Sequence, residues 1–210
     1  MSNILLVLSS PRGEASLSTK VARSLAGAVA DKNGASVTVR DLGANPPAHI
    51  DREFVVAATA PSDEPTAAQK AAAEESDRLI AEIAAADTVV IGAAMINFAV
   101  TSPLKSWFDH LAVRGKTFRY TEAGPEGLLK GKKAYIVVAS AGVYSDGPTK
   151  AIDFALPYIR HMLGFMGITD VEVIRVEGLA FGAEAAEKAI SGAMARAGAL
   201  AEAHGQAIAA

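Results

Sequence analysis

"NILLVLSSPRGEASLSTK", residues 3–20, joins an apolar run directly to a loop rich in hydroxyl side chains, which then opens a helical pattern. The run 3–8 is nearly all apolar, as is typical of a parallel strand covered on both faces. The loop ends at a predicted helix N-terminus, where free N–H groups and a partial positive charge favour a phosphate. Ser10, Ser16, Ser18 and Thr19 can add hydroxyl donors there. The stretch therefore predicts a strand, a candidate anion-binding loop and a helix in succession, with an ordinary capped turn as the alternative for the loop.

The rest of the chain repeats the alternation of strand and helix. Apolar runs predict further strands at 35–40, 87–92, 134–140 and 170–176. Helical spacing and capping residues predict helices at 18–34, 66–86 and 102–113, one around 150–164 and one from 183 onward. In the helix 102–113, Ser102 is the predicted N-cap and Pro103 the first helical residue. The pattern predicts a three-layer α/β sandwich around a five-stranded parallel sheet, built as a single domain over residues 1–210.

The composition restricts the partners that the chain can have. Its 210 residues carry a net charge of −3 with no basic cluster, which argues against nucleic acid or an anionic membrane. The absence of cysteine excludes disulfides and cysteine nucleophiles, and the four histidines lack metal-ligand spacing, so no metal site is predicted. The start lacks the features of a signal peptide and no run reaches the ~20 apolar residues of a membrane span, so we expect a cytoplasmic location.

One long segment interrupts the alternation. "GANPPAHIDREFVVAATAPSDEPT", residues 43–66, contains four prolines and is predicted to be irregular. A loop of that length in a compact domain is usually functional or part of an interface. Its apolar residues Phe54, Val55 and Val56 need a cover, which is either a second subunit or the rest of the same chain.

Two more loops follow strands at the edge where open parallel sheets bind ligands. "AAMINFAVTSP" (93–103) follows the third strand and places the bare amide of Asn97 among apolar residues. "SAGVYSDGP" (140–148) follows the fourth strand, and Gly142 lets its backbone approach a planar ligand. A phosphate end and two loops rich in backbone groups fit a mononucleotide with a flat head group. The first loop has no G-x-G-x-x-G fingerprint, and "GLLKGKK" (127–133) is not a P-loop.

Five stretches carry a resemblance to a known family: "SS…ASLS" (9–18), "MINF" (95–98), "KSWFDHLAVRGKTFRYTEAGPEGLLKGKKA" (105–134), "SAGVYSDGP" (140–148) and "LGFMGITDV" (163–171). Within the third of them, "FRYTEAGPEGLLKGKKA" (118–134) is especially specific. Over nearly its full length the chain resembles the FMN-dependent NAD(P)H:quinone oxidoreductases and azoreductases of bacteria. The resemblance implies a flavodoxin-like fold with strand order 2-1-3-4-5, in which FMN lies in the crevice between the first and third strands.

The resemblance also implies the residues that hold FMN tightly. Ser10 and Ser16-Leu17-Ser18 would hold the phosphate, and Met95-Ile96-Asn97-Phe98 would wrap the ribityl chain and the ring. Ser140-Ala141-Gly142-Val143 would close on the pyrimidine side of the ring. Phe118 and Tyr120 are candidates for the substrate pocket, with a core or interface role equally open. Two positions depart from the family: Ile96 replaces a usual tyrosine, and Val143 replaces a frequent glycine.

The implied activity passes two electrons from NADH or NADPH to quinones by a ping-pong sequence, and cleaves azo compounds reductively. The flavin carries that chemistry, so no catalytic residue is assigned. Members of the family form homodimers with sites at the interface, and we expect the segment 43–66 and the helix 102–113 to form that interface here. The alternative function is a flavodoxin-type FMN electron carrier without an organic substrate. The sequence leaves open the choice between NADH and NADPH and the physiological acceptor.

Overall fold

The computed structural model describes residues 2–59 and 63–209. Five parallel strands form the main sheet in the order β2-β1-β3-β6-β7, so the predicted order 2-1-3-4-5 of these five strands is confirmed. Their bounds are β1 (Asn3–Leu8), β2 (Ser36–Asp41), β3 (Thr88–Ala94), β6 (Lys133–Ala139) and β7 (Asp170–Val176). The alternating strand β7 lies at an edge, as its pattern predicts, and the nearly all-apolar strands lie inside the sheet.

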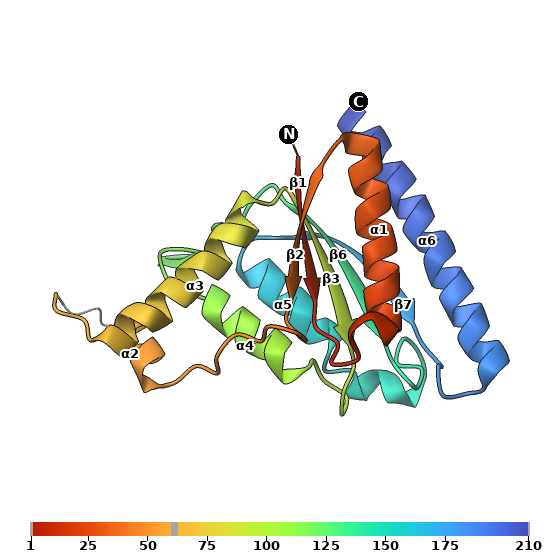
Figure 1. The fold of residues 1–210 in the computed structure, drawn as a ribbon, viewed down its shortest axis with the longest axis horizontal. Helices are drawn as coiled ribbons and strands as arrows, with labels where there is room; N and C mark the ends of the chain where they lie inside the picture. Colours follow the sequence, from red (N-terminus) through yellow and green to blue (C-terminus); the bar gives the residue numbers. More distant parts are fainter. Residues whose placement is uncertain (1, 60–62, 210) are drawn as a thin grey trace.

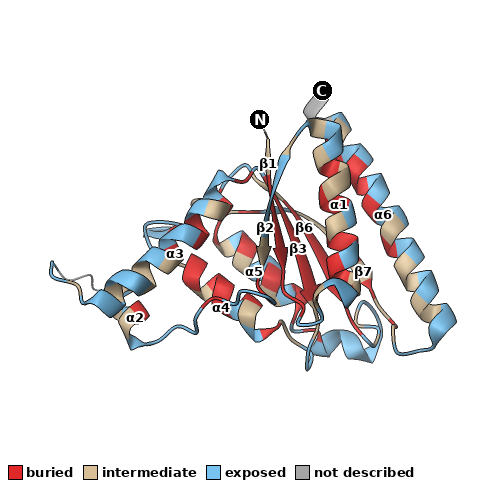
Figure 2. Ribbon diagram, in the orientation of Figure 1, coloured by how far each residue is buried: buried red, intermediate tan, exposed pale blue. Residues whose placement is uncertain are grey.

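Helices cover both faces of this sheet and give it three layers (Figure 1). On one face, α1 (Leu17–Asn33) and α6 (Ala183–Ala209) pack on one set of strand residues, such as Leu6 and Val90. On the other face, α3 (Ala67–Ala85), α4 (Ser102–Leu111) and α5 (Leu156–Phe165) pack on the alternate set, such as Leu5 and Val89. Successive strand side chains point to opposite faces, so the inner strands are buried from both sides (Figure 2).

The strand register brings the functional loops to one edge. β1 pairs with β3 through Leu8 and Gly92, and β3 pairs with β6 through Ala94 and Ala139. The strands β1, β3 and β6 therefore end together, and the loops that follow them leave the sheet at the same side. We call this side the carboxyl edge and the opposite side the amino edge.

Local signals explain where most helices begin and end. Ser16 caps α1, and Gly34 ends it in the left-handed conformation with φ 59°. Thr66 and Gln69 form a capping box at the start of α3. The helix α4 begins one residue earlier than predicted, so Ser102 is its first residue and Thr101 its N-cap. The Thr101 hydroxyl donates to the Ser9 carbonyl at 3.1 Å, because the cap position faces the first loop instead of its own helix.

The segment 43–66 is not irregular throughout. It contains the helix α2 (Arg52–Thr59), whose start is held by the Asp51 carboxylate, which accepts from the Phe54 amide at 2.9 Å. The Phe54 ring is buried and packs edge-on against the His110 ring, with centroids 4.9 Å apart. The same chain therefore covers Phe54, while Val55 stays 47 % exposed. Residues 60–62 of the segment lie outside the described residues.

Three smaller elements complete the chain. The 3-10 helices η1 (Gly13–Ala15) and η2 (Pro148–Ile152) lie in the first and third loops, so the predicted helix around 150–164 is η2 followed by α5. An antiparallel hairpin, β4 (Phe118–Thr121) and β5 (Gly124–Gly127), was not predicted. It packs against the turn after α5 so tightly that a Cβ on Gly127 would lie 2.1 Å from the Gly167 nitrogen. No helix in the described part of the chain is long and apolar enough to cross a membrane.

Candidate cofactor site

A cavity of about 350 Å³ opens at the carboxyl edge, where the three predicted loops meet. Seven of the residues predicted to hold a cofactor line it: Ser10, Ser16, Leu17, Met95, Ile96, Ser140 and Ala141. A second hollow of about 430 Å³ adjoins it, since both include Pro11 and Ile96, and this second hollow contains Asn97. The volume of the cavity lies within the usual range for small-molecule sites.

One end of the cavity is built by the first turn of α1. The Ser16 hydroxyl accepts from the Thr19 amide at 3.5 Å and lies 3.0 Å from the Ser18 hydroxyl. The first amides of a helix have no partner within it, so this end presents donors and a partial positive charge. A Cβ on Gly92 would lie 3.1 Å from the Ser18 carbonyl oxygen, so the first turn of α1 packs directly on β3. The geometry suits an anion such as a phosphate.

Asn97 and Phe98 form the tip of a tight turn at the other end. The amides and carbonyls of Ile96 and Ala99 bond each other at 3.0 and 3.1 Å, which closes a two-residue hairpin. Asn97 has φ 48° and Phe98 has φ 70°, and no other non-glycine residue among those described has a positive φ. Asparagine is favoured at such turns because it tolerates the left-handed conformation. The backbone conformation therefore explains Asn97 without any ligand.

The third wall comes from the loop after β6, held by a segment that the sequence did not single out. The Ala180 amide donates to the Ala141 carbonyl at 3.0 Å, and the Gly178 amide donates to the Gly142 carbonyl at 3.0 Å. This pairing carries Leu179 and Ala180 to the cavity, which they line. Backbone groups and small side chains thus form a wall that a flat ring can approach closely.

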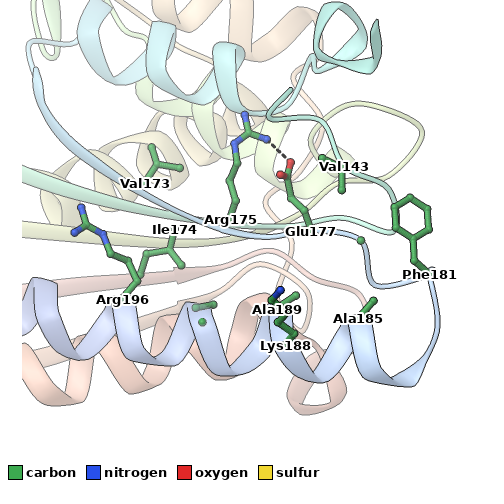
Figure 3. A pocket seen from close by; sticks show the side chains of 13 residues that line it. Val143, Val173, Ile174, Arg175, Glu177, Phe181, Ala185, Lys188, Ala189 and Arg196 are labelled. Carbon is green, nitrogen blue, oxygen red and sulfur yellow. Dashed lines mark hydrogen bonds and ion pairs between the residues drawn. The ribbon is translucent and has the colours of Figure 1, made fainter. Parts of the chain in front are cut away.

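The remaining predicted residues lie around the cavity and do not line it. Ser18 is fully buried beneath Ser16, and Phe98 is 46 % exposed with its ring edge-on to Tyr144. Gly142 is absent from the lining of the cavity, and Val143 borders a separate groove between β7 and α6 (Figure 3).

The two candidates for a substrate pocket lie on the hairpin β4–β5. Phe118 is buried, and its ring packs on Phe165 with centroids 4.5 Å apart. Tyr120 is 62 % exposed, with its ring edge-on to Phe118. Neither lines the cavity of its own chain. Phe118 therefore packs within its own chain, and a substrate-pocket role for either residue stays a prediction.

Sequence reasoning missed Arg12, which lines the cavity beside Ser10 and Ser16. Its signal was available, because it is the only cation between the first strand and the first turn of the helix. Among the described residues, no carboxylate lines the cavity and no group of three His, Asp or Glu side chains is arranged to hold a metal ion. Donors and a cation at one end and flat apolar walls at the other fit a phosphate-bearing cofactor with a planar ring.

The fold and this cavity define a flavodoxin-like mononucleotide-binding protein, with the cavity at the carboxyl edge between β1 and β3. The family model described as flavodoxin-like fold matches residues 2–201. An FMN-dependent NADH:quinone oxidoreductase of Agrobacterium fabrum is 54 % identical over 204 residues, which cover 97 % of this chain and 100 % of the relative.

Solved structures agree with these relatives. An azoreductase from Bacillus anthracis superposes with a TM-score of 0.89 at 27 % identity, covering 96 % of this chain and 99 % of that one. An FMN-dependent NADH-azoreductase from the same species, solved in complex with FMN, gives a TM-score of 0.85 at 26 % identity over 96 % of this chain and 100 % of that one. The chain belongs to the flavodoxin-like family of FMN-dependent NADH:quinone oxidoreductases, which confirms the resemblance.

Proposed function

We propose that this chain is an FMN-dependent oxidoreductase that transfers two electrons from NADH or NADPH to quinones and cleaves azo compounds reductively. One observation carries the proposal: the donor-rich start of α1 and the two flat-walled loops line one cavity at the carboxyl edge. The relatives named above support the same activity. The proposal treats residues 1–210 as one FMN-binding domain, although residues 1, 60–62 and 210 lie outside the described part.

In this proposal the first turn of α1 holds the phosphate, through Ser10, Ser16 and the amides of Leu17 and Ser18, with Arg12 adding a positive charge. Met95, Ile96 and Asn97 flank the ribityl chain and one side of the ring. Ser140 and Ala141 flank the other side, supported by Leu179 and Ala180. FMN, when bound, supplies two-electron redox chemistry, and the protein supplies orientation and electrostatics.

A ping-pong sequence is part of the proposal. The cavity of about 350 Å³ and its neighbouring hollow share a common border, so donor and acceptor would use the same opening in turn. No side chain lining the cavity in the described part of the chain is a general acid or base, since Arg12 is its only ionisable group. We therefore assign the protein residues to binding and orientation and none to proton transfer.

A homodimer is part of the proposal, with the segment 43–66 and the helix 102–113 as the predicted interface. Trp107 and Phe108 of that helix are buried in their own chain, whereas Val55 of the segment stays exposed. Large apolar side chains also remain exposed around the carboxyl edge: Ile96, Phe98, Val143, Phe154 and Phe181. A second copy covering this rim would remove that apolar surface from water. The cytoplasmic location stays a prediction.

The purified protein tests the proposal directly. We expect heat-released flavin to migrate as FMN, and NADH or NADPH to bleach the bound flavin in a stopped-flow experiment without a partner protein. A quinone should then restore the oxidised spectrum. If the flavin is FAD, the assignment of the cavity fails. If FMN is bound but neither nucleotide reduces it, the alternative of an electron carrier replaces the enzyme.

A further inference from the structure

Arg175 lies near the end of the edge strand β7 and joins two carboxylates. Its guanidinium donates to the Asp153 carboxylate at 2.7 Å and to the Glu177 carboxylate at 2.7 Å. Figure 3 shows the Arg175 and Glu177 side chains on the side of β7 that faces away from α6. The Arg175 side chain is 22 % exposed and the Asp153 side chain 2 % exposed, so the pair is largely shielded from water. The planar fork of arginine suits such a double contact better than a lysine ammonium does.

The two carboxylates hold opposite ends of the loop 144–153. The Glu177 carboxylate also accepts from the Tyr144 amide at 2.9 Å, where the loop begins. The other oxygen of Asp153 accepts from the amides of Ala155 and Leu156 at 3.0 Å each, where the loop ends and α5 starts. A single guanidinium therefore connects both ends of this loop.

Both ends of the loop touch the Asn97-Phe98 turn. The Phe154 amide donates to the Phe98 carbonyl at 2.9 Å. The Tyr144 ring stands edge-on to the Phe98 ring, with centroids 6.3 Å apart. Phe98 occupies the left-handed region at φ 70°, which is sterically unfavourable for a residue that carries a side chain. Such a conformation persists only where the surroundings hold it.

We propose that Arg175 is a positioning residue of the cofactor site: through Asp153 and Glu177 it fixes the loop 144–153 against the Asn97-Phe98 turn, and so sets the geometry of the cavity mouth. The proposal rests on the proposed function, because it assigns this network to the same cavity. Arg175 does not line that cavity itself, so it acts through the turn and the loop.

The test compares Arg175→Gln and Arg175→Lys with Arg196→Gln in FMN-loaded protein. Arg196 is a matched control: it borders the same groove and pairs with Glu172 at 3.1 Å, but it is not part of the loop network (Figure 3). The readouts are the visible absorption spectrum of bound FMN, the separate kcat and KM values for a quinone, and the thermal midpoint.

We expect Arg175→Gln to alter the flavin spectrum and to lower kcat/KM for the quinone by about 10–100-fold, as a small misplacement of a binding wall does. Arg175→Lys keeps the positive charge but not the planar fork, so its flavin spectrum and its kcat/KM should lie between those of Arg175→Gln and the wild type. Arg196→Gln should match the wild type. If Arg175→Gln does not fold, Arg175→Lys alone decides the question.

Two results would overturn the proposal. In the first, the folded Arg175 variants keep the wild-type spectrum and kcat/KM. In the second, they lose activity only in proportion to folded protein, with KM and spectrum unchanged. In either case a wild-type protein that binds FMN and is reduced by NADH leaves the proposed function standing. A wild-type protein that does neither removes the proposed function itself.

Discussion

At the amino edge of the sheet a hollow of about 390 Å³ is lined by charged and titratable groups, among them Lys132, Lys133, Asp170 and His204. The cavity at the carboxyl edge is of similar size, about 350 Å³, but hydroxyls, backbone and small apolar side chains form its walls. The two hollows lie at opposite ends of the same strands. The strand β1 starts and the helix α6 ends at the amino edge (Figure 1). Volume therefore does not distinguish the two hollows.

Hydrogen bonding does distinguish them. At the amino edge, Lys132 donates to the carbonyls of Ala84 and Ala86, and Lys133 pairs with Asp170 at 2.8 Å. The Tyr135 hydroxyl and His204 Nδ1 lie 2.9 Å apart. The charged groups at the amino edge therefore form hydrogen bonds and ion pairs within the chain. At the carboxyl edge the first turn of α1 keeps unpaired amides, and the turn at Asn97 keeps a strained backbone. In a ligand site, hydrogen-bond donors stay available for the ligand. In a purely structural edge, the same donors would bond to other groups of the protein.

The largest effect on binding is expected at the start of α1. Ser16→Ala with Ser18→Ala should weaken FMN by about 1–3 kcal/mol, because the Ser16 hydroxyl, which the buried Ser18 hydroxyl contacts at 3.0 Å, no longer donates to a charged group. Ser36→Ala is the control at the amino edge, where the Ser36 hydroxyl donates to the Asn3 side chain at 2.7 Å. It should leave the FMN dissociation constant unchanged. Fluorescence titration measures the FMN affinity of the wild type, the double variant and Ser36→Ala. An unchanged affinity in the double variant would contradict the assignment of the phosphate to the start of α1.

The next prediction separates strain from binding. Asn97→Ala and Gly34→Ala both force alanine into a positive φ, and each should lower the free energy of unfolding by about 1 kcal/mol. Asn97→Ala should also weaken FMN, whereas Gly34→Ala, at the far end of α1, should not. Asn97→Gly keeps the turn conformation and removes only the side-chain amide. Its FMN affinity should therefore stay within about tenfold of the wild type, which corresponds to the loss of one hydrogen bond. If Asn97→Ala lowers the stability but leaves the FMN affinity unchanged, the turn does not shape the cofactor site.

A pH effect on stability is expected at the amino edge. Burial, aided by the charge of Lys133, lowers the pKa of His204, and burial raises the pKa of Tyr135, so a neutral phenol and a neutral imidazole share this hydrogen bond. Because the folded pKa of His204 lies below its unfolded value, the unfolded state binds more protons, and stability is lost as pH falls below about 6.5. His204→Asn keeps an acceptor and removes the titration.

The thermal midpoint of His204→Asn should therefore fall less steeply between pH 7 and pH 5, at about 2–4 °C for each kcal/mol recovered. Its FMN affinity, measured at pH 7, should equal that of the wild type. A parallel decline of the two midpoints with pH would exclude His204 as the source of acid sensitivity.

Among the variants at the carboxyl edge, the smallest effect on cofactor affinity is expected from Ile96→Tyr. Ile96 is 41 % exposed and borders both hollows at the carboxyl edge. Its amide and carbonyl bond Ala99 whatever the side chain is, so FMN affinity should hardly change. A tyrosine adds a ring and a hydroxyl to the pocket wall, so kcat/KM should change unevenly across a panel of quinone and azo acceptors. A large loss of FMN with an unaltered acceptor profile would place residue 96 in the cofactor site alone.

Much of this architecture follows from the sequence alone, because the signals are local. Apolar runs mark the five strands, and the predicted helix starts at 18 and 66 lie one residue from the observed starts of α1 at Leu17 and α3 at Ala67. Parallel strands must end at a common edge, so the three loops that line the cavity are expected to meet there before any contact is known. The helix α2 was not predicted, because the four prolines of the segment 43–66 indicated an irregular loop and the helical stretch after Asp51 is short.

Only the tertiary structure decided the rest, because those features depend on residues far apart in the chain. Leu179 and Ala180 reach the cavity through backbone pairing with the loop after β6, which carries no side-chain signal. Phe118 joined the core because Phe165 from α5 meets it. The positive φ of Asn97 and Phe98 is maintained by the hairpin and by the distant Phe154 amide. Local propensity sets the elements, whereas backbone pairing and packing between distant segments set the shape of the site.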